Sequence, residues 1–238
     1  MSTDADLVTL TDIPFYWEFV PLAAEGAEQR FTEHMVEFFG KWAGRTLDTA
    51  RTAWTAGEFP FTAEAVGRET ARVLIEKADD LPGYARLAWG TAFHDGQVRW
   101  APIPLVAEFH RPRADDPEYL MEVVGAHGLP EDAREPVLHY VSVPGADGVR
   151  VFAVGRTPHG TAYGRVDAAM RLDSGLDVVL RTRVFEMPQM AVIGAGVEQL
   201  MTTIAADGVT LPADGVTFPA AGVTFPTAGV TLPEEADQ

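Results

Sequence analysis

The chain has 238 residues, of which 35 are acidic and 18 basic, so its formal net charge is −17 at pH 7. A surface this acidic repels nucleic-acid phosphates and anionic lipid headgroups, so we expect neither a nucleic-acid partner nor membrane insertion. The sequence contains no cysteine, which excludes disulfides, thiolate nucleophiles, zinc–thiolate sites and iron–sulfur clusters.

The N-terminal sequence and the composition bear on where the protein works. Residues 1–19 are acidic and lack the basic start and apolar run of a secretory signal, and no stretch approaches eighteen uninterrupted apolar residues. We therefore expect a cytoplasmic protein. Lys41 and Lys77 are the only lysines, and this preference for arginine is typical of a GC-rich bacterial genome.

The first 80 residues predict a short strand followed by helices. Residues 13–22 are dense in aromatic side chains and predict a strand or an extended arm. Apolar side chains then recur with helical spacing on one face; they are Phe31, Met35, Phe38, Phe39 and Trp42. A second short helix is predicted around residues 47–54. A third is predicted over 63–78, with Thr62 as its cap. Its predicted buried stripe is Val66, Val73 and Leu74.

The next segment predicts a hairpin and a further helix. Alternation over residues 86–93 predicts a strand, and Asp95-Gly96 is typical of a two-residue hairpin turn. The return strand carries Pro102 and Pro104, so we expect an edge strand or a kink there. Proline after two acidic residues at 115–118 then predicts the start of a helix.

Residues from 136 onward predict a meander of four strands and a last helix. The strands cover 137–143, 149–156, 161–172 and 177–185, and the helix covers 188–204. The helix places Met190, Ile193, Val197, Leu200 and Met201 on one side. The fold class is therefore α+β: N-terminal helices packed on a largely antiparallel meander, then a C-terminal helix. We predict one globular domain over 1–205 and a repetitive tail over 206–238.

Residues that could carry chemistry are few. No serine-hydrolase, zinc-hydrolase or phosphate-loop motif is present, so we predict no catalytic residue, metal ion or cofactor. Glu108 and His110 share one face of a strand and are followed by Arg111, which predicts a polar ligand site at a strand end. The alternative interpretation is a solvated strand end with local ion pairs. Gly194-Ala195-Gly196 lacks the context of a dinucleotide fingerprint, and we interpret it as close helix packing.

Aromatic residues offer a second possible site. The five tryptophans, together with Phe15, Tyr16 and Phe19, could line an apolar ligand pocket between helices and sheet. Packing within the core is the alternative, and aromatic side chains serve it more often.

The C-terminal residues contain a four-copy repeat, Gly-Val-Thr-Leu/Phe-Pro, with a period of seven. Every unit contains proline and glycine, so the repeat is predicted to be non-helical. In an extended chain, valine and leucine or phenylalanine lie two apart and point to one side. The predicted partner-binding residues are Val209, Leu211, Val216, Phe218, Val223, Phe225, Val230 and Leu232.

Two classes of function remain open. The first is a non-catalytic interaction or accessory protein that docks through its tail onto a repetitive protein assembly, such as a shell, ring, filament or secretion apparatus. The alternative is a small-molecule-binding protein or an enzyme, with an aromatic-lined pocket near Glu108 and His110. The repeat could also lack a partner, or fold back onto a sheet edge of its own chain.

Overall fold

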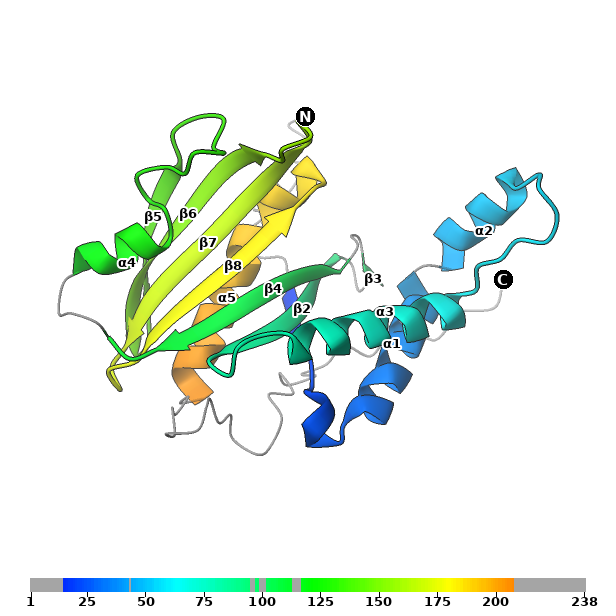
Figure 1. The fold of residues 1–238 in the computed structure, drawn as a ribbon, viewed down its shortest axis with the longest axis horizontal. Helices are drawn as coiled ribbons and strands as arrows, with labels where there is room; N and C mark the ends of the chain where they lie inside the picture. Colours follow the sequence, from blue (N-terminus) through cyan, green and yellow to red (C-terminus); the bar gives the residue numbers. More distant parts are fainter. Residues whose placement is uncertain (1–14, 43, 95–96, 99–101, 113–116, 208–238) are drawn as a thin grey trace, which may run out of the picture. The chain divides into compact units, whose positions relative to one another are not determined.

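The computed structural model describes residues 15–42, 44–94, 97–98, 102–112 and 117–207 (Figure 1). It confirms the α+β class. The chain divides into two compact units: Phe19–Pro82, called here the helical unit, and Met1–Glu18 with Gly83–Gln238, called the sheet unit. Residues 206 and 207, predicted to begin the tail, instead belong to the last helix, and the rest of the predicted tail, including its eight partner-binding residues, lies outside the described residues. The predicted packing of the N-terminal helices on the meander and the domain boundary at 205/206 stay predictions.

The helical unit contains a short 3-10 helix, η2 (Ala23–Glu25), and three helices. The helices are α1 (Glu28–Trp42), α2 (Gly44–Ala53) and α3 (Ala63–Asp79). The predicted face of α1 is confirmed for four of its five residues, because Phe31, Met35, Phe38 and Phe39 are buried, whereas Trp42 is half-buried. The Thr62 side chain caps α3 by accepting a hydrogen bond from the Ala65 N–H at 3.0 Å.

The buried stripe predicted for α3 is wrong. Val73 is exposed, and Val66 and Leu74 are only half-buried. The buried residues are small ones: Gly67, Ala71 and Ala78. A Cβ atom on Gly67 would lie 2.7 Å from the Cα of Val36, so the backbones of α1 and α3 meet at this glycine. Close approach of two helices favours small residues over large ones at the contact.

The sheet unit is built on strands β1 (Phe15–Phe19), β2 (Ala85–His94), β3 (Gln97–Val98), β4 (Ile103–His110), β5 (Val137–Val143), β6 (Ala146–Arg156), β7 (Ala162–Leu172) and β8 (Asp177–Val184). The order across the sheet is β1-β2-β4-β8-β7-β6-β5, with β3 paired to β2. The registers of the pairs from β2 to β5 are all antiparallel. The four strands predicted after residue 136 are thereby confirmed.

Two details of the strands differ from prediction. Strand β4 is not an edge strand, because it pairs with β2 on one side and with β8 on the other. The ladder between β4 and β8 begins at Leu105. Pro104 precedes this ladder, so the N–H that proline lacks removes no hydrogen bond from the ladder. The turn between β5 and β6 contains only Pro144 and Gly145, because Val143 pairs directly with Ala146.

Three further helical segments complete the sheet unit: α4 (Pro117–Val123), η3 (Met187–Gln189) and α5 (Met190–Asp207). Their bounds confirm the helix predicted to start near residue 117 and the one predicted over 188–204. The turn residues Asp95 and Gly96 lie outside the described residues, but His94 pairs with Gln97 on either side of them.

The two faces of the sheet differ in chemistry, and α5 lies against one face whereas α4 lies against part of the other (Figure 1). On the first face, called the α5 face, Val166, Ala168 and Met170 alternate with the residues of the other face and are buried. Gly194 and Gly196 of α5 contact the rings of Phe152 and Phe15. The interpretation of these glycines as close-packing residues is thus confirmed.

The opposite face is called the α4 face. There Leu120 of α4 and Val124, the residue after α4, pack in one cluster with Val149, Val151, Ala169 and Val179. The remainder of this face carries charged side chains, and these define the candidate site.

Candidate functional site

A row of charged residues crosses three neighbouring strands on the α4 face. Because cross-strand partners share a face, the register of β7 with β8 brings Arg165 opposite Arg183 and Asp167 opposite Arg181. Strand β4 adds two further residues at its end. We call the following set the charged row: Glu108, His110, Asp132, Arg165, Asp167, Arg181 and Arg183.

The inner part of the charged row is buried. The side chain of Arg165 has no exposed surface, and it donates to Asp132 at 2.6 Å and to Asp167 at 2.9 Å. It also donates to the carbonyl oxygens of Val124 at 2.8 Å and Gly125 at 3.3 Å, which follow α4. Burial lowers the pKa of Arg165, but the hydrogen bonds and charges of the two aspartates outweigh it, so the pKa is raised overall. Arg165 therefore stays protonated and joins α4 and its following loop to the sheet.

The outer part of the charged row is half-exposed. Arg181 donates to Glu108 at 3.1 Å and to the carbonyl oxygen of Val123 at 3.1 Å. His110 lies 3.2 Å from the other oxygen of Glu108, and its ring lies 5.0 Å from that of Tyr84. The side chains of Glu108 and His110 are 23% and 31% exposed, so water reaches this end of the row.

The structure brings together part of the polar cluster predicted from sequence. Glu108 and His110 are in contact, whereas Arg111 follows β4 with an exposed side chain, and no described contact joins it to either residue. Arg181 is the arginine that contacts Glu108. Sequence reasoning missed it, although Arg181 and Arg183 alternate with buried Leu180, Thr182 and Val184 in a predicted strand. That alternation was the available signal.

The chemistry of the charged row is that of ion pairing. Its three arginines face three carboxylates, so their formal charges cancel. Within the described ranges, no group of three or more histidine, aspartate and glutamate side chains is placed to hold a metal ion. The row therefore has the character of a structural network, in which each arginine positions a carboxylate or a backbone carbonyl.

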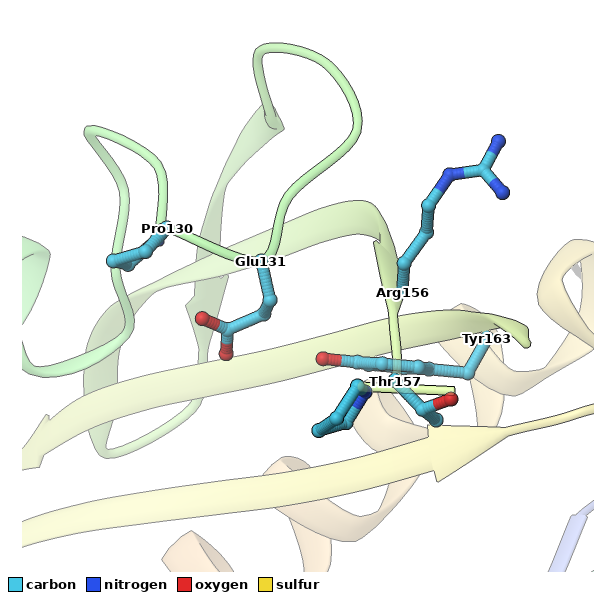
Figure 2. Close-up of a pocket in the computed structure, with 6 residues that line it drawn as sticks. Pro130, Glu131, Arg156, Thr157 and Tyr163 are labelled. Atoms are coloured by element: carbon cyan, nitrogen blue, oxygen red, sulfur yellow. The ribbon is translucent and has the colours of Figure 1, made fainter. Parts of the chain in front are cut away.

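A pocket of about 570 Å³ opens at the other end of the sheet (Figure 2). It is lined by Pro130, Glu131, Arg156, Thr157, Pro158 and Tyr163. Tyr163 lies across Gly155 on the neighbouring strand, where a Cβ would come within 2.5 Å of the ring. Glu131 is held beside the end of β6, because its carbonyl oxygen accepts from the Arg156 N–H at 3.1 Å.

The residues that line this pocket include one carboxylate, one guanidinium and one aromatic ring. Tyr163 is almost wholly buried, whereas the side chains of Glu131 and Arg156 are exposed. The guanidinium of Arg183 lies 6.0 Å from the centre of the Tyr163 ring, which links the pocket to the charged row. A volume of this size is within the range of small-molecule sites.

None of the tryptophans in the described ranges lines this pocket. Trp17 and Trp89 are buried in the sheet unit, where the core-packing interpretation is correct. The Trp17 indole lies on Gly90 and donates to the carbonyl oxygen of Gly196 at 2.8 Å. Trp54 is 41% exposed in the helical unit, and Trp100 lies outside the described residues.

No protein-family model matches the chain, and comparisons with curated proteins and with solved structures likewise give no match. Within the described helices, none combines the length and apolar character needed to cross a membrane.

Proposed function

We propose that the chain is a non-catalytic accessory protein that binds a repetitive protein assembly through its C-terminal repeat. The observation that carries this proposal is the repeat itself: four Gly-Val-Thr-Leu/Phe-Pro units at an unbroken spacing of seven, from residue 208 to residue 233. Each unit offers a short apolar motif with a proline, which lowers the entropy lost on ordering. Four copies on one chain raise the effective concentration of the motif at a partner with repeated sites.

The attachment of the repeat to the body supports this proposal. The repeat follows α5, and α5 is held to the sheet by polar contacts as well as by its apolar face. Arg150 on β6 donates to Glu198 at 2.8 Å and to the carbonyl oxygen of Gly194, and Trp17 donates to Gly196. The helix that precedes the repeat is therefore fixed to the sheet, and the repeat is attached to a rigid part of the sheet unit.

A series of variants with fewer intact motifs tests the proposal. Motifs are inactivated one, two, three or four at a time by replacing the valine and the leucine or phenylalanine with serine, in the full chain. Co-purified proteins from the native host are quantified against the wild type. We expect retention of a partner to fall as more motifs are lost, because avidity depends on the number of copies available to bind. A partner set that is unchanged when all four motifs are inactive would overturn the proposal.

A second candidate function, small-molecule binding, rests on the pocket at Tyr163. Arg156 could pair with an anionic group of a ligand while the tyrosine ring contacts an apolar part. A thermal-shift screen against small carboxylates and phosphates tests this candidate, since a ligand that binds the folded state raises Tm. The shift should disappear in Arg156→Ala and persist in Arg134→Ala, an exposed arginine that does not line the pocket. Equal shifts in both variants would exclude this pocket.

A further inference from the structure

Strand β5 forms one side of the described sheet. In the part of the chain that the structure describes, β5 is the terminal strand and pairs with β6. Two of its large side chains are exposed, Val137 at 51% and Tyr140 at 82%. A seven-residue edge with exposed apolar side chains is a template for strand addition.

The turn between β5 and β6 shows which backbone groups of β5 point outward. Val143 and Ala146 flank the two-residue turn and form its hydrogen-bonded closing pair. Directly opposed residues of an antiparallel ladder alternate between bonded and non-bonded pairs. Leu138, Tyr140 and Ser142 are therefore the residues that direct their N–H and C=O groups away from β6. Their side chains lie on the α4 face, opposite Val151, Val149 and Asp147.

The last turn of α5 lies close to this edge. Helix α5 ends at Asp207, one residue before the first copy of the motif. A Cβ added to Gly145 would lie 3.6 Å from the carbonyl oxygen of Ala205 and 3.9 Å from its Cβ. Gly145 is in the turn at which β5 ends. A segment that leaves α5 here and follows the edge runs antiparallel to β5, like the paired strands from β2 to β5.

We infer that residues 208–212, the first copy of the repeat, add to β5 of the same chain as an antiparallel strand. The position of the proline agrees with this arrangement. Along a strand, successive N–H groups point to alternate sides. If the N–H groups of Val209 and Leu211 point toward β5, the N–H of a residue at position 212 would point away from β5, and this is the position that proline occupies. An outer strand tolerates proline at such a position, and the proline also blocks addition of a further strand.

The side chains agree as well. Residues that exchange hydrogen bonds with Tyr140 and Ser142 lie on the same face as these residues. With the shortest connection from α5, Leu211 lies opposite Tyr140 and Val209 opposite Ser142. The apolar side of the motif then covers Tyr140, which is otherwise 82% exposed. The first copy then pairs with β5 and the other three copies remain for a partner, so this inference does not depend on the proposed function.

Hydrogen exchange in two proline variants of the full chain tests the inference. Val209→Pro removes an N–H directed toward β5, whereas Thr210→Pro removes one directed outward. Amide exchange of Tyr140 and Ser142 is measured by NMR, with Val141, whose amide faces β6, as the internal reference. We expect exchange of both amides to be about tenfold faster or more in Val209→Pro and unchanged in Thr210→Pro. Equal exchange in the wild type and both variants overturns the inference.

Engineered cysteines identify which chain supplies the strand. The chain has no cysteine of its own, so each introduced pair can form one intramolecular disulfide. The pair Tyr140→Cys with Leu211→Cys lies on one face at about 5.5 Å between Cα atoms, within disulfide range. The control pair, Tyr140→Cys with Thr210→Cys, lies on opposite faces. A monomer that oxidises faster in the first pair supports the inference. Equal oxidation of both pairs, or disulfide-linked dimers, overturns it.

Discussion

Arg165 and Asp132 are joined at 2.6 Å across 33 residues of sequence, and the side chains of both are almost wholly buried. This ion pair ties the loop after α4 to the middle of strand β7. Asp167, the other carboxylate that contacts Arg165, is also shared with Arg183 at 2.6 Å. Among the two carboxylates that contact Arg165, Asp132 is therefore the one not shared with Arg183. The position of the loop after α4 depends on this ion pair.

Replacement of Asp132 by alanine should destabilise the sheet unit strongly. It leaves Arg165 as a buried cation that must share Asp167 with Arg183, and a buried ion left without its partner costs about 3–5 kcal/mol. Urea unfolding measures this cost. The Ala133 N–H, which donates to the carbonyl oxygen of Val154 at 2.7 Å, should also exchange faster by NMR because the loop loses its anchor.

Glu198→Ala is the matched control for this prediction. Glu198 is also paired with an arginine of the sheet, Arg150, but its side chain is 48% exposed. Its loss should cost about 1 kcal/mol or less, because water can replace the carboxylate. If the two variants are equally stable, the buried network does not hold the loop in the way described.

Gly67→Ala should destabilise the helical unit although alanine is the better helix former. The added Cβ would lie 2.7 Å from the Cα of Val36 and 2.8 Å from the carbonyl oxygen of Met35, so α1 and α3 must separate. Overpacking of this kind typically costs about 1–3 kcal/mol.

Gly40→Ala is the control within the same unit: it lies in α1 with nothing within 4 Å of its new Cβ. It should gain up to about 1 kcal/mol from helix propensity. Thermal unfolding followed by circular dichroism should rank the variants in that order, and the reverse order would contradict the packing described.

Gly90→Ala should disturb the packing of Trp17 in the sheet unit. The new Cβ would lie 2.4 Å from Cε3 of the indole and 2.7 Å from the carbonyl oxygen of Tyr16. The carbonyl oxygen belongs to the backbone, so it cannot move aside as a side chain can. We expect a loss of about 1–3 kcal/mol and a red shift of tryptophan emission as water reaches the ring. Gly83→Ala, which has open space around it, should leave both quantities unchanged.

Periodicity predicted most of the fold because most elements obey a local rule. The buried face of α1 and the strands β5 to β8 follow alternation or helical spacing, and polar turns separate the strands. The errors arose where a neighbour in space decided the outcome. Strand β4 carries Pro104, but its position in the sheet depends on where the ladder with β8 begins. Which residues of α3 are buried depends on how closely α1 approaches it, and the sequence of α3 alone does not indicate this distance.

The candidate site was predicted less completely for a similar reason. Glu108 and His110 were identified because they are two residues apart on one strand. Arg181 and Asp132 come from distant parts of the chain and reach the charged row only through strand pairing and the loop after α4. A search for charged residues that alternate with buried ones would have found Arg181 and Arg183. It would not have found Asp132, which lies in a loop.

Tyr16 gives the sheet unit a dependence on alkaline pH. Its hydroxyl donates to Glu18 at 3.2 Å, and Glu18 also accepts from the Trp89 indole at 3.2 Å. Burial raises the pKa of Tyr16 far above its ordinary value, and the negative charge of Glu18 and the hydrogen bond to it raise the pKa further. The folded chain therefore keeps Tyr16 neutral at a pH at which the unfolded chain ionises it.

The sign of the effect follows from this difference. Below pH 10 both states are protonated at Tyr16, and the stabilisation is present in full. Above pH 10 the unfolded state loses its proton first, so stability falls by about 1.4 kcal/mol for each unit of pH. Urea unfolding at pH 9 and pH 11 should show the wild type losing about 1.4 kcal/mol more than Tyr16→Phe, which has no proton to lose. If Tyr16→Phe declines as steeply as the wild type, Tyr16 is not held neutral by Glu18 and its burial.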